Sequence, residues 1–155
     1  MKRTILSRRG KVLTTVALAA ALGGVSGVAT ASAPHGATLT TLAEGDFVEP
    51  HDIRVKNVTD VVQQTLTIKP GGDTGWHIHP GIVVLTVKKG TITRKNYDCS
   101  VEVFTAGTSF VKQGWMPLNG VNEGSEDLEV HLTYLKPEGT PLRYEREAPQ
   151  HCDFN

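Results

Sequence analysis

The sequence lacks several features that would assign a function at sight. After residue 31 it has no apolar run long enough to span a membrane, no basic patch, and no charge run longer than a few residues. No Ser-His-Asp or Cys-His arrangement is visible, and there is no internal repeat and no long helical period. These absences argue against a nucleic-acid partner and a stable membrane anchor.

Residues 1–31 have the pattern of a signal peptide. A basic start precedes an apolar stretch from residue 12 to about residue 28, and Ala-Thr-Ala at 29–31 supplies a small-x-small cleavage pattern. A membrane anchor is the alternative, but no basic stop-transfer cluster follows the apolar stretch. We therefore expect a secreted, extracellular protein. Export would follow the general secretory route or the twin-arginine route, at which Ser7-Arg8-Arg9 hints.

Removal of this segment leaves 124 of the 155 residues, which is enough for one domain with its own core. Five of the 16 Lys and Arg fall within the segment, but none of the 16 Asp and Glu does. The remainder thus carries 11 basic and 16 acidic residues, a net charge of −5. Residues 32–50 are small, polar and weakly patterned, so we expect a short N-terminal arm followed by a folded domain at 51–155.

The domain has the pattern of many short strands. Polar and apolar residues alternate in several stretches, including 61–68 and 128–135, and turn residues separate these stretches. Within 61–68 the polar Gln64 shares the apolar face, so its side chain is expected to point inward. Prolines keep the C-terminal tail irregular, apart from a short helical turn expected at 142–147. The pattern predicts an all-β sandwich or barrel.

The only cysteines are Cys99 and Cys152. An even cysteine count in an exported chain predicts a disulfide bond, because oxidising compartments favour pairing. The alternative is a pair of free thiols. A bond would tie the C-terminal tail to the middle of the domain.

A glycine-rich segment carries the main candidate site. It runs from Gly71 to Gly81 and contains His77 and His79. Residues two apart on an extended backbone point to the same side, so the two imidazoles share a face. Neutral imidazoles suit Fe, Mn, Ni, Cu or Zn, and the pair predicts a divalent transition-metal site that two protein ligands complete only in part. Alternatively, the histidines are buried relics in an inherited cavity.

This segment resembles the first of the two motifs of the cupin family, with Gly71, His77, His79 and Gly90 in register. Val83 stands where that motif has its glutamate. The stretch from Gly107 resembles the second motif less closely: Asn122 is in register, but Leu118 takes the histidine position. The resemblance implies a single cupin-type jelly-roll β-barrel with a short N-terminal arm and an irregular C-terminal tail. The family's metal site, which uses three histidines and a glutamate, would be reduced to two ligands.

Four residues are expected to line the barrel pocket, namely Gln64, Val83, Leu118 and Asn122. Two further histidines are candidates to complete the metal site. His131 alternates with Glu129 and Thr133, which places it opposite the apolar face, and His51 fits an exposed loop better than a ligand.

The sequence therefore predicts a secreted cupin-domain protein that binds a transition metal or small ligand in its barrel through the His-x-His pair. One alternative is a metal-dependent dioxygenase or isomerase that acts on a small organic substrate. No residue stands out as a general base beside the pair, and whether the protein is an enzyme stays open. Another alternative is a metal-free extracellular binding barrel, which could form a homodimer through an exposed strand.

Overall fold

The computed structural model describes residues 40–55, 57 and 59–154. The predicted signal peptide at 1–31, and with it the sequence basis for export, lies outside the described residues. Within the described part of the chain, no helix has the length and apolar character needed to cross a membrane.

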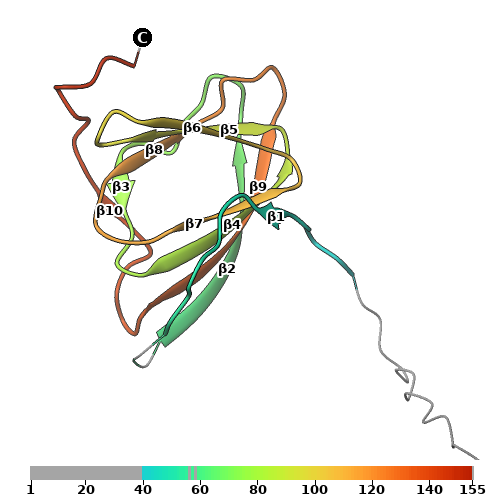
Figure 1. Cartoon of the computed structure of the whole chain (residues 1–155), viewed down its shortest axis with the longest axis vertical. Coiled ribbons are helices and arrows are strands. Elements are labelled where there is room, and N and C mark those ends of the chain that lie inside the picture. The colour runs from blue at the N-terminus through green and yellow to red at the C-terminus, as the bar shows by residue number, and fades with distance from the viewer. Residues whose placement is uncertain (1–39, 56, 58, 155) are drawn as a thin grey trace, which may run out of the picture. The chain divides into compact units, whose positions relative to one another are not determined.

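Two five-stranded sheets face each other (Figure 1). The first contains, in order, β1 (Asp46–Phe47), β7 (Thr108–Lys112), β4 (Ile82–Lys89), β9 (Leu128–Pro137) and β2 (Thr59–Ile68). The second contains β10 (Tyr144–Glu145), β3 (His77–Ile78), β8 (Leu118–Val121), β5 (Thr91–Asn96) and β6 (Val101–Thr105). All pairs are antiparallel except β1 with β7, and the sheets do not close into one ladder. The all-β jelly-roll prediction is confirmed.

Strand β9 shows how the alternating pattern builds the core. Its buried residues are Leu128, Val130, Leu132 and Tyr134, and the residues between them are only partly covered. Side chains on alternate residues of a strand point to opposite faces, so one face of β9 packs inward along its whole length. The core cluster around this face consists of Ile68, Val83, Leu85, Val87, Ile92, Phe104, Phe110, Leu128, Val130, Leu132 and Tyr134.

A pair of stacked aromatic rings bridges the two sheets. The centroids of Phe104 on β6 and Phe110 on β7 lie 4.0 Å apart. The guanidinium of Arg94 lies 5.2 Å from the centroid of each ring, within the range of a cation–π contact. This packing holds a partly buried cation beside the space between the sheets.

Both ends of the domain differ from their sequence-based description. The weakly patterned arm contributes β1, which pairs in parallel with β7. In the tail, the predicted helical turn at 142–147 is wrong, because Tyr144 and Glu145 form β10 against β3. The amide of Arg146 also donates to the carbonyl of Trp76 at 2.8 Å. The tail thus satisfies backbone groups that the edge of β3 would otherwise leave unpaired.

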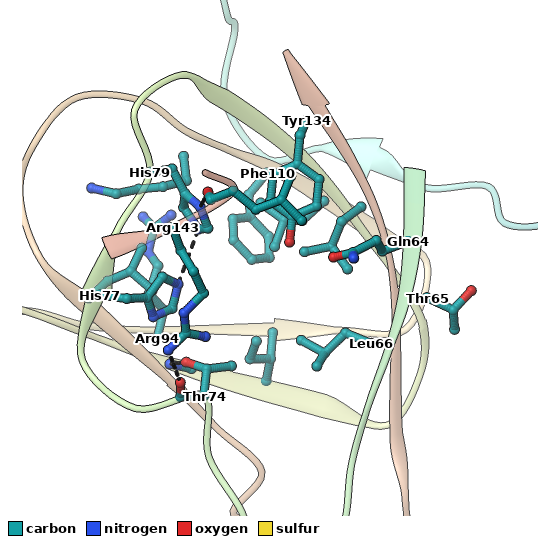
Figure 2. Close-up of a pocket in the computed structure, with 17 residues that line it drawn as sticks. Gln64, Thr65, Leu66, Thr74, His77, His79, Arg94, Phe110, Tyr134 and Arg143 are labelled. Atoms are coloured by element: carbon teal, nitrogen blue, oxygen red, sulfur yellow. Dashed lines mark hydrogen bonds between the residues drawn. The ribbon is translucent and has the colours of Figure 1, made fainter. Parts of the chain in front are cut away.

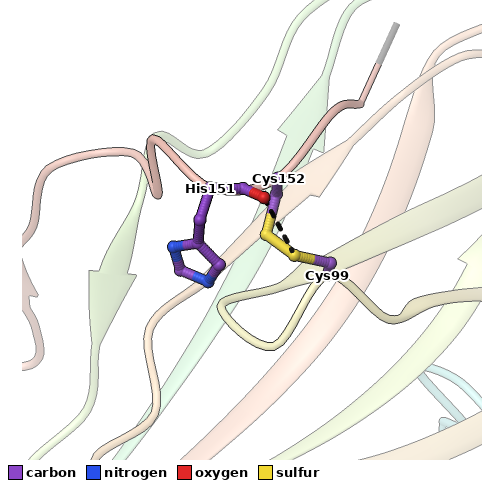
Figure 3. A group of neighbouring side chains, drawn as sticks. All are labelled: Cys99, His151 and Cys152. Atoms are coloured by element: carbon purple, nitrogen blue, oxygen red, sulfur yellow. Dashed lines mark hydrogen bonds between the residues drawn. A yellow bond between two sulfur atoms is a disulfide. The ribbon is translucent and has the colours of Figure 1, made fainter.

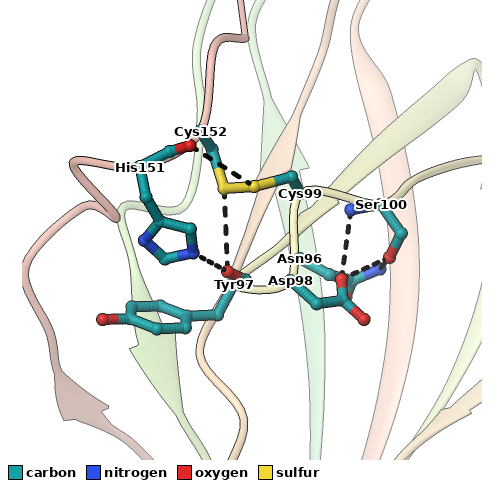
Figure 4. The surroundings of a disulfide bond; sticks show 7 residues. All are labelled: Asn96, Tyr97, Asp98, Cys99, Ser100, His151 and Cys152. Atoms are coloured by element: carbon teal, nitrogen blue, oxygen red, sulfur yellow. Dashed lines mark hydrogen bonds between the residues drawn. A yellow bond between two sulfur atoms is a disulfide. The ribbon is translucent and has the colours of Figure 1, made fainter.

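The predicted disulfide is present and joins Cys99, after β5, to Cys152 in the tail (Figure 3). The ring of His151 lies beside it and approaches the carbonyl oxygen of Tyr97 to 3.0 Å through Nε2 (Figure 4). Although these three side chains are close enough for metal ligation, both sulfur atoms belong to the S–S bond. Neither is a thiolate, the form of cysteine that binds metal.

Candidate functional site

The loop before β3 orients the two motif histidines. Gly75 has a φ of 68°, a left-handed conformation that glycine adopts without steric cost. The carboxylate of Asp73 accepts a hydrogen bond from the Gly75 amide at 2.6 Å. The amide of Thr74 donates to the carbonyl of Gly120 at 2.9 Å, which fixes the loop to β8. The chain then enters β3 with its first side chain directed inward.

His77 and His79 are both buried and meet through their Nε2 atoms, which lie 3.1 Å apart. The Nδ1 atom of His77 is 2.7 Å from the carbonyl oxygen of Gly75, and that of His79 is 2.8 Å from the carbonyl oxygen of Leu142. Figure 2 shows the two rings side by side at one wall of the cavity. Each ring is therefore held at one nitrogen by the backbone and presents the other nitrogen to its neighbour.

The backbone contacts determine where the protons are. A carbonyl oxygen can only accept, so Nδ1 of His77 and Nδ1 of His79 must each carry the donated hydrogen. In the neutral form of an imidazole, the second nitrogen then has a free lone pair. Two lone pairs thus face each other across 3.1 Å. A proton or a metal ion between them would relieve the repulsion.

Protonation of the pair is disfavoured. Burial lowers the pKa of His77 to about 4, and the neighbouring His79 and Arg143 lower it further against the opposing effect of the Gly75 carbonyl. The pKa of His79 is also lowered, first by burial and then by the positive charges of Arg143 and Lys112. At neutral pH both rings are therefore neutral, which is the form that ligates metals.

The pair lines a cavity of about 530 Å³ between the two sheets. Its lining residues are Gln64, Thr65, Leu66, Thr74, His77, His79, Leu85, Ile92, Arg94, Phe110, Lys112, Leu118, Gly120, Leu132, Tyr134, Leu142 and Arg143. Aliphatic and aromatic side chains form much of the wall. Among the described residues that line it, three are cationic and none is Asp or Glu. A cavity of this size with an apolar wall and a few polar groups is typical of a small-molecule site.

The three cationic side chains differ in their contacts. Arg94 pairs with Glu102, and Arg143 pairs with Glu145 while also donating to the carbonyl of Thr74 at 2.7 Å. Lys112 is buried and donates to the carbonyl of Met116 at 2.6 Å. Burial first, and then the charge of Arg94, lowers the pKa of Lys112.

The structure places two of the four expected lining residues at the cavity wall. Gln64 lines the cavity opposite Leu132 on β9 (Figure 2), and Leu118 lines it as the register partner of His77. Although Gln64 belongs to a largely exposed stretch of β2, its side chain reaches this space, as its position on the apolar face indicates.

The other two expected lining residues lie elsewhere. Val83 is packed in the core, between its register partners Lys112 and Tyr134, and does not reach the cavity surface. Asn122 is almost fully buried and donates to the carbonyls of Ile68 and Glu126, at 2.8 Å each. Its amide braces a turn, so its motif position serves the fold.

Neither further histidine joins the pair. The ring of His131 lies between the hydroxyl of Thr65, at 3.4 Å, and the carboxylate of Glu129, at 3.5 Å. It alternates with the inward-facing Leu132 and therefore faces the other side of the sheet. His51 is exposed, and its ring contacts that of Phe47.

Sequence reasoning missed several residues of the cavity, above all Arg94, Tyr134 and Arg143. A signal existed for Arg94, because it alternates with Ile92 on the inward face of β5. Tyr134 lies on the face that alternation predicts to be apolar in 128–135, but the pattern does not mark its phenol as a site group. Arg143 carries no such signal, since it lies in the irregular tail that only the β10–β3 pairing brings to the site.

Comparison with known proteins agrees with this architecture. Residues 64–134 match the family model described as the cupin domain. No curated protein matches the chain. Together with the jelly-roll fold, the match identifies residues 64–134 as a cupin domain.

Several solved structures are similar to the chain. A structure of DMSP lyases RdDddP and RnDddQII is 13% identical, with 56% of this chain and 44% of that chain covered and a TM-score of 0.50. A protein with a double-stranded β-helix domain from Klebsiella pneumoniae is 21% identical, with 59% and 81% covered and a TM-score of 0.49. The polyketide cyclase RemF from Streptomyces resistomycificus is 18% identical, with 57% and 64% covered and a TM-score of 0.48. At these identities the likeness concerns the fold alone.

Proposed function

We propose that this protein is an exported cupin that binds a divalent transition metal through Nε2 of His77 and Nε2 of His79, beside a cavity that takes a small organic ligand. One observation carries the proposal: two Nε2 lone pairs lie 3.1 Å apart, and each Nδ1 hydrogen is already committed to a backbone carbonyl. The lowered pKa of both rings makes a proton a poor bridge between them.

The donor set fits such an ion. Bonds from imidazole nitrogen to zinc are about 2.0–2.1 Å long, so one ion can reach two nitrogens that are 3.1 Å apart. Carbonyl oxygens that accept from the outer ring nitrogens fix the orientation of ligating histidines, and both rings have such a partner. Two imidazoles suit Fe, Mn, Ni, Cu or Zn. When bound, the metal would act as a Lewis acid toward an oxygen atom of the ligand.

The remaining cavity residues favour binding over turnover. Described residues of the wall include no carboxylate or thiolate that could act as a general base. Burial raises the pKa of Tyr134, so its phenol stays protonated and can donate a hydrogen bond to a ligand. Lys112 already donates to the Met116 carbonyl. These groups can orient a small molecule near the histidine pair.

Export is supported by two features from different parts of the chain. The first 31 residues have the basic, apolar and small-residue regions of a signal peptide. The disulfide between Cys99 and Cys152 is of the kind that persists in oxidising compartments. We therefore place the working site of this protein outside the cytoplasm.

Metal analysis tests this function directly. The protein would be exported by its own signal, purified without chelator, and analysed by plasma mass spectrometry. We expect near-stoichiometric metal in the wild type and its loss in His77→Asn/His79→Asn. The asparagine amide can still donate to the carbonyls of Gly75 and Leu142, so the local hydrogen bonds are retained. Asparagine has no counterpart of the histidine Nε2, so the metal ligand is lost.

His131→Asn is the matched control, because His131 lies on the far side of the sheet from the pair and should leave the metal content unchanged. A metal-free wild type whose melting temperature does not respond to added Zn²⁺, Mn²⁺, Fe²⁺, Ni²⁺ or Cu²⁺ would contradict the proposal. A folded His77→Asn/His79→Asn variant that retains its metal would do the same.

A further inference from the structure

The charge of the cavity wall is one-sided. Arg94, Lys112 and Arg143 line it, and no described residue of the wall is Asp or Glu. The side chain of Arg94 is only 15% exposed and that of Arg143 is 33% exposed. Positive charge in a partly desolvated, apolar space has a strong influence on what can enter it.

The carboxylates that pair with the two arginines lie outside the cavity wall. Glu145 holds Arg143 through both carboxylate oxygens, at 2.8 Å from Nε and 2.6 Å from Nη2, but its own side chain is 72% exposed. Glu102 contacts Arg94 from the β6 side and is 39% exposed. Glu145 is therefore well solvated, whereas Glu102 is partly buried. They position the guanidinium groups but offset their charge inside the cavity only in part.

Arg143 is a cation of the wall that contacts the loop before the histidine pair, at the carbonyl of Thr74. Figure 2 shows its side chain beside His77, reaching toward Thr74 at the cavity wall. Arg143 follows Leu142, whose carbonyl oxygen accepts from Nδ1 of His79, and it lines the same cavity as both rings. A divalent ion on the same rings would be repelled by the charge of Arg143. Glu145 offsets this positive charge in part from outside the wall, and a negative charge on the ligand would offset the rest.

We propose that the ligand of this cavity is a small organic carboxylate with an apolar body, whose charge is held by Arg143 and lies next to the metal on His77 and His79. This inference rests on the proposed function for the presence of the metal. Nε and Nη2 of Arg143 already donate to Glu145 and Thr74, so an oxygen of the ligand would accept a charge-assisted hydrogen bond from Nη1. The walls formed by Leu66, Leu85 and Ile92 would cover the apolar body.

Metal and carboxylate should bind cooperatively. Each offsets a charge that the other would otherwise leave unbalanced, so each should raise the affinity for the other by the same factor. For a coupling of ordinary size this factor is about 5-fold or more. The arginine also sits on the tail, so the ligand preference depends on the segment that β10 and the disulfide hold in place.

Matched pairs of a carboxylate and its neutral amide give the test. Benzoate and benzamide, and hexanoate and hexanamide, would be titrated into the full mature protein by calorimetry at low ionic strength. The titrations would be made on metal-free protein and on protein loaded with Zn²⁺. We expect at least one carboxylate to bind about 10-fold more tightly than its amide, which is the usual size of one charge-assisted hydrogen bond. The affinity for Zn²⁺ should rise about 5-fold or more when this carboxylate is present.

Variants distinguish the effect of the Arg143 charge on ligand preference from the effect of the tail structure. Arg143→Gln should abolish the carboxylate preference, and Arg143→Lys should retain part of it. Arg146→Gln removes a neighbouring exposed arginine and should change nothing. Glu145→Gln removes the ion-pair partner of Arg143 but keeps the guanidinium, so the preference should persist or increase. Loss of the preference in Glu145→Gln would instead show that tail stability, and not the Arg143 charge, controls binding.

The outcomes distinguish this inference from the proposed function. Equal affinity for carboxylate and amide in every pair, or no binding of any probe, overturns the ligand class while metal content still tests the metal site. A carboxylate preference in a protein that binds no metal supports the ligand class and contradicts the proposed function. If carboxylates do not raise the affinity for zinc, the predicted coupling between metal and carboxylate is wrong.

Discussion

His79 donates its Nδ1 hydrogen to the carbonyl oxygen of Leu142, which lies 63 residues further along the chain, at 2.8 Å. The next residue is Arg143, and the two after it form β10 against β3. The far end of the same tail is joined to Cys99. A segment of irregular sequence is thereby built into the site: it orients one candidate ligand and supplies a cation to the cavity.

The first prediction concerns the bond that anchors the tail. Cys99→Ser/Cys152→Ser should lower the free energy of unfolding by about 4 kcal/mol, because the bond closes a loop between residues 53 apart. Denaturant unfolding of the variant and the wild type measures the difference. Amide hydrogen exchange at Arg146 should also accelerate, since its hydrogen bond to Trp76 lies on the anchored segment.

A reducing agent provides the control for this variant. It should lower the unfolding midpoint of the wild type to that of Cys99→Ser/Cys152→Ser, and it should leave the double variant unchanged. An unfolding midpoint that is the same with and without the bond would show that the tail is held by β10 alone.

The second prediction concerns the pH dependence of the metal-free protein. The pKa of His77 is about 4 in the folded state and about 6.5 when unfolded, so the unfolded chain binds more protons between these values. Stability should therefore be fully present above pH 6.5 and decline as the pH falls toward 4. The ring faces His79, Arg143 and Glu145, and burial is the largest cause of its shift. Thermal melting in chelator at pH 7, 6 and 5 measures the decline.

Carboxylates titrate in a lower range and can be separated from this effect. Glu102, Glu123, Glu129 and Glu145 have pKa values below their ordinary 4.5, so their stabilisation is lost mainly under more acidic conditions. His77→Asn/His79→Asn should flatten the profile between pH 6.5 and 5. If that variant keeps the wild-type slope in this window, the histidine pair is not its source.

Local pattern was enough to predict the elements that have one buried face. Leu128 to Tyr134 alternate in the sequence and in the structure, and the two-residue spacing of His77 and His79 places both rings on one side. The tail could not be predicted in this way. Arg143 reaches the cavity because backbone groups of β3 select a partner strand, and this choice depends on the assembled sheet.

Motif register also failed to predict what a side chain does. Asn122 stands in register with a cupin motif, yet its amide donates to two backbone carbonyls in a turn. Val83, at the motif's glutamate position, packs in the core below the wall. Motif register predicts where a residue lies in the fold. The role of its side chain depends on which polar groups of the neighbouring chain need a hydrogen-bond partner.

The third prediction follows from the contacts of Asn122. Asn122→Ala leaves the buried carbonyl of Ile68 without this partner and also removes the partly buried contacts with the Glu126 carbonyl and the Gly124 amide. The free energy of unfolding should fall by about 2–4 kcal/mol, because an unsatisfied buried polar group costs roughly 1–3 kcal/mol. Chemical denaturation measures it. Asn119→Ala, which removes a contact of its side chain with Thr74, is a milder comparison and should cost about 1 kcal/mol.

A role in the cavity would give a different result for Asn122. The Asn122→Ala protein should keep the wild-type metal content and the wild-type preference between benzoate and benzamide once it is folded. If a stable Asn122→Ala protein has lost either property, Asn122 contributes to metal or ligand binding.

The fourth prediction concerns the close packing of the histidine segment against β9. A Cβ added at Gly81 would clash with the carbonyl oxygen of Leu135 and lie 2.6 Å from Cα of Lys136, both backbone atoms that cannot rotate away. Gly81→Ala should therefore lower the free energy of unfolding by about 3 kcal/mol or more, since relief requires the backbone to move. It should also weaken metal binding, because Gly81 lies two residues after His79. Thermal melting and zinc titration of the variant measure the two effects.

Gly114→Ala separates crowding from backbone strain. Gly114 has a φ of 85°, but a Cβ there meets no atom within 4 Å, so only the left-handed conformation opposes the substitution. We expect a loss of about 1 kcal/mol and an unchanged affinity for zinc. The contrary result would be a Gly81→Ala protein with the melting temperature of Gly114→Ala and the zinc affinity of the wild type. That result would mean that the backbone of β9 shifts to make room for the added Cβ. The position of His79 would then not depend on this contact.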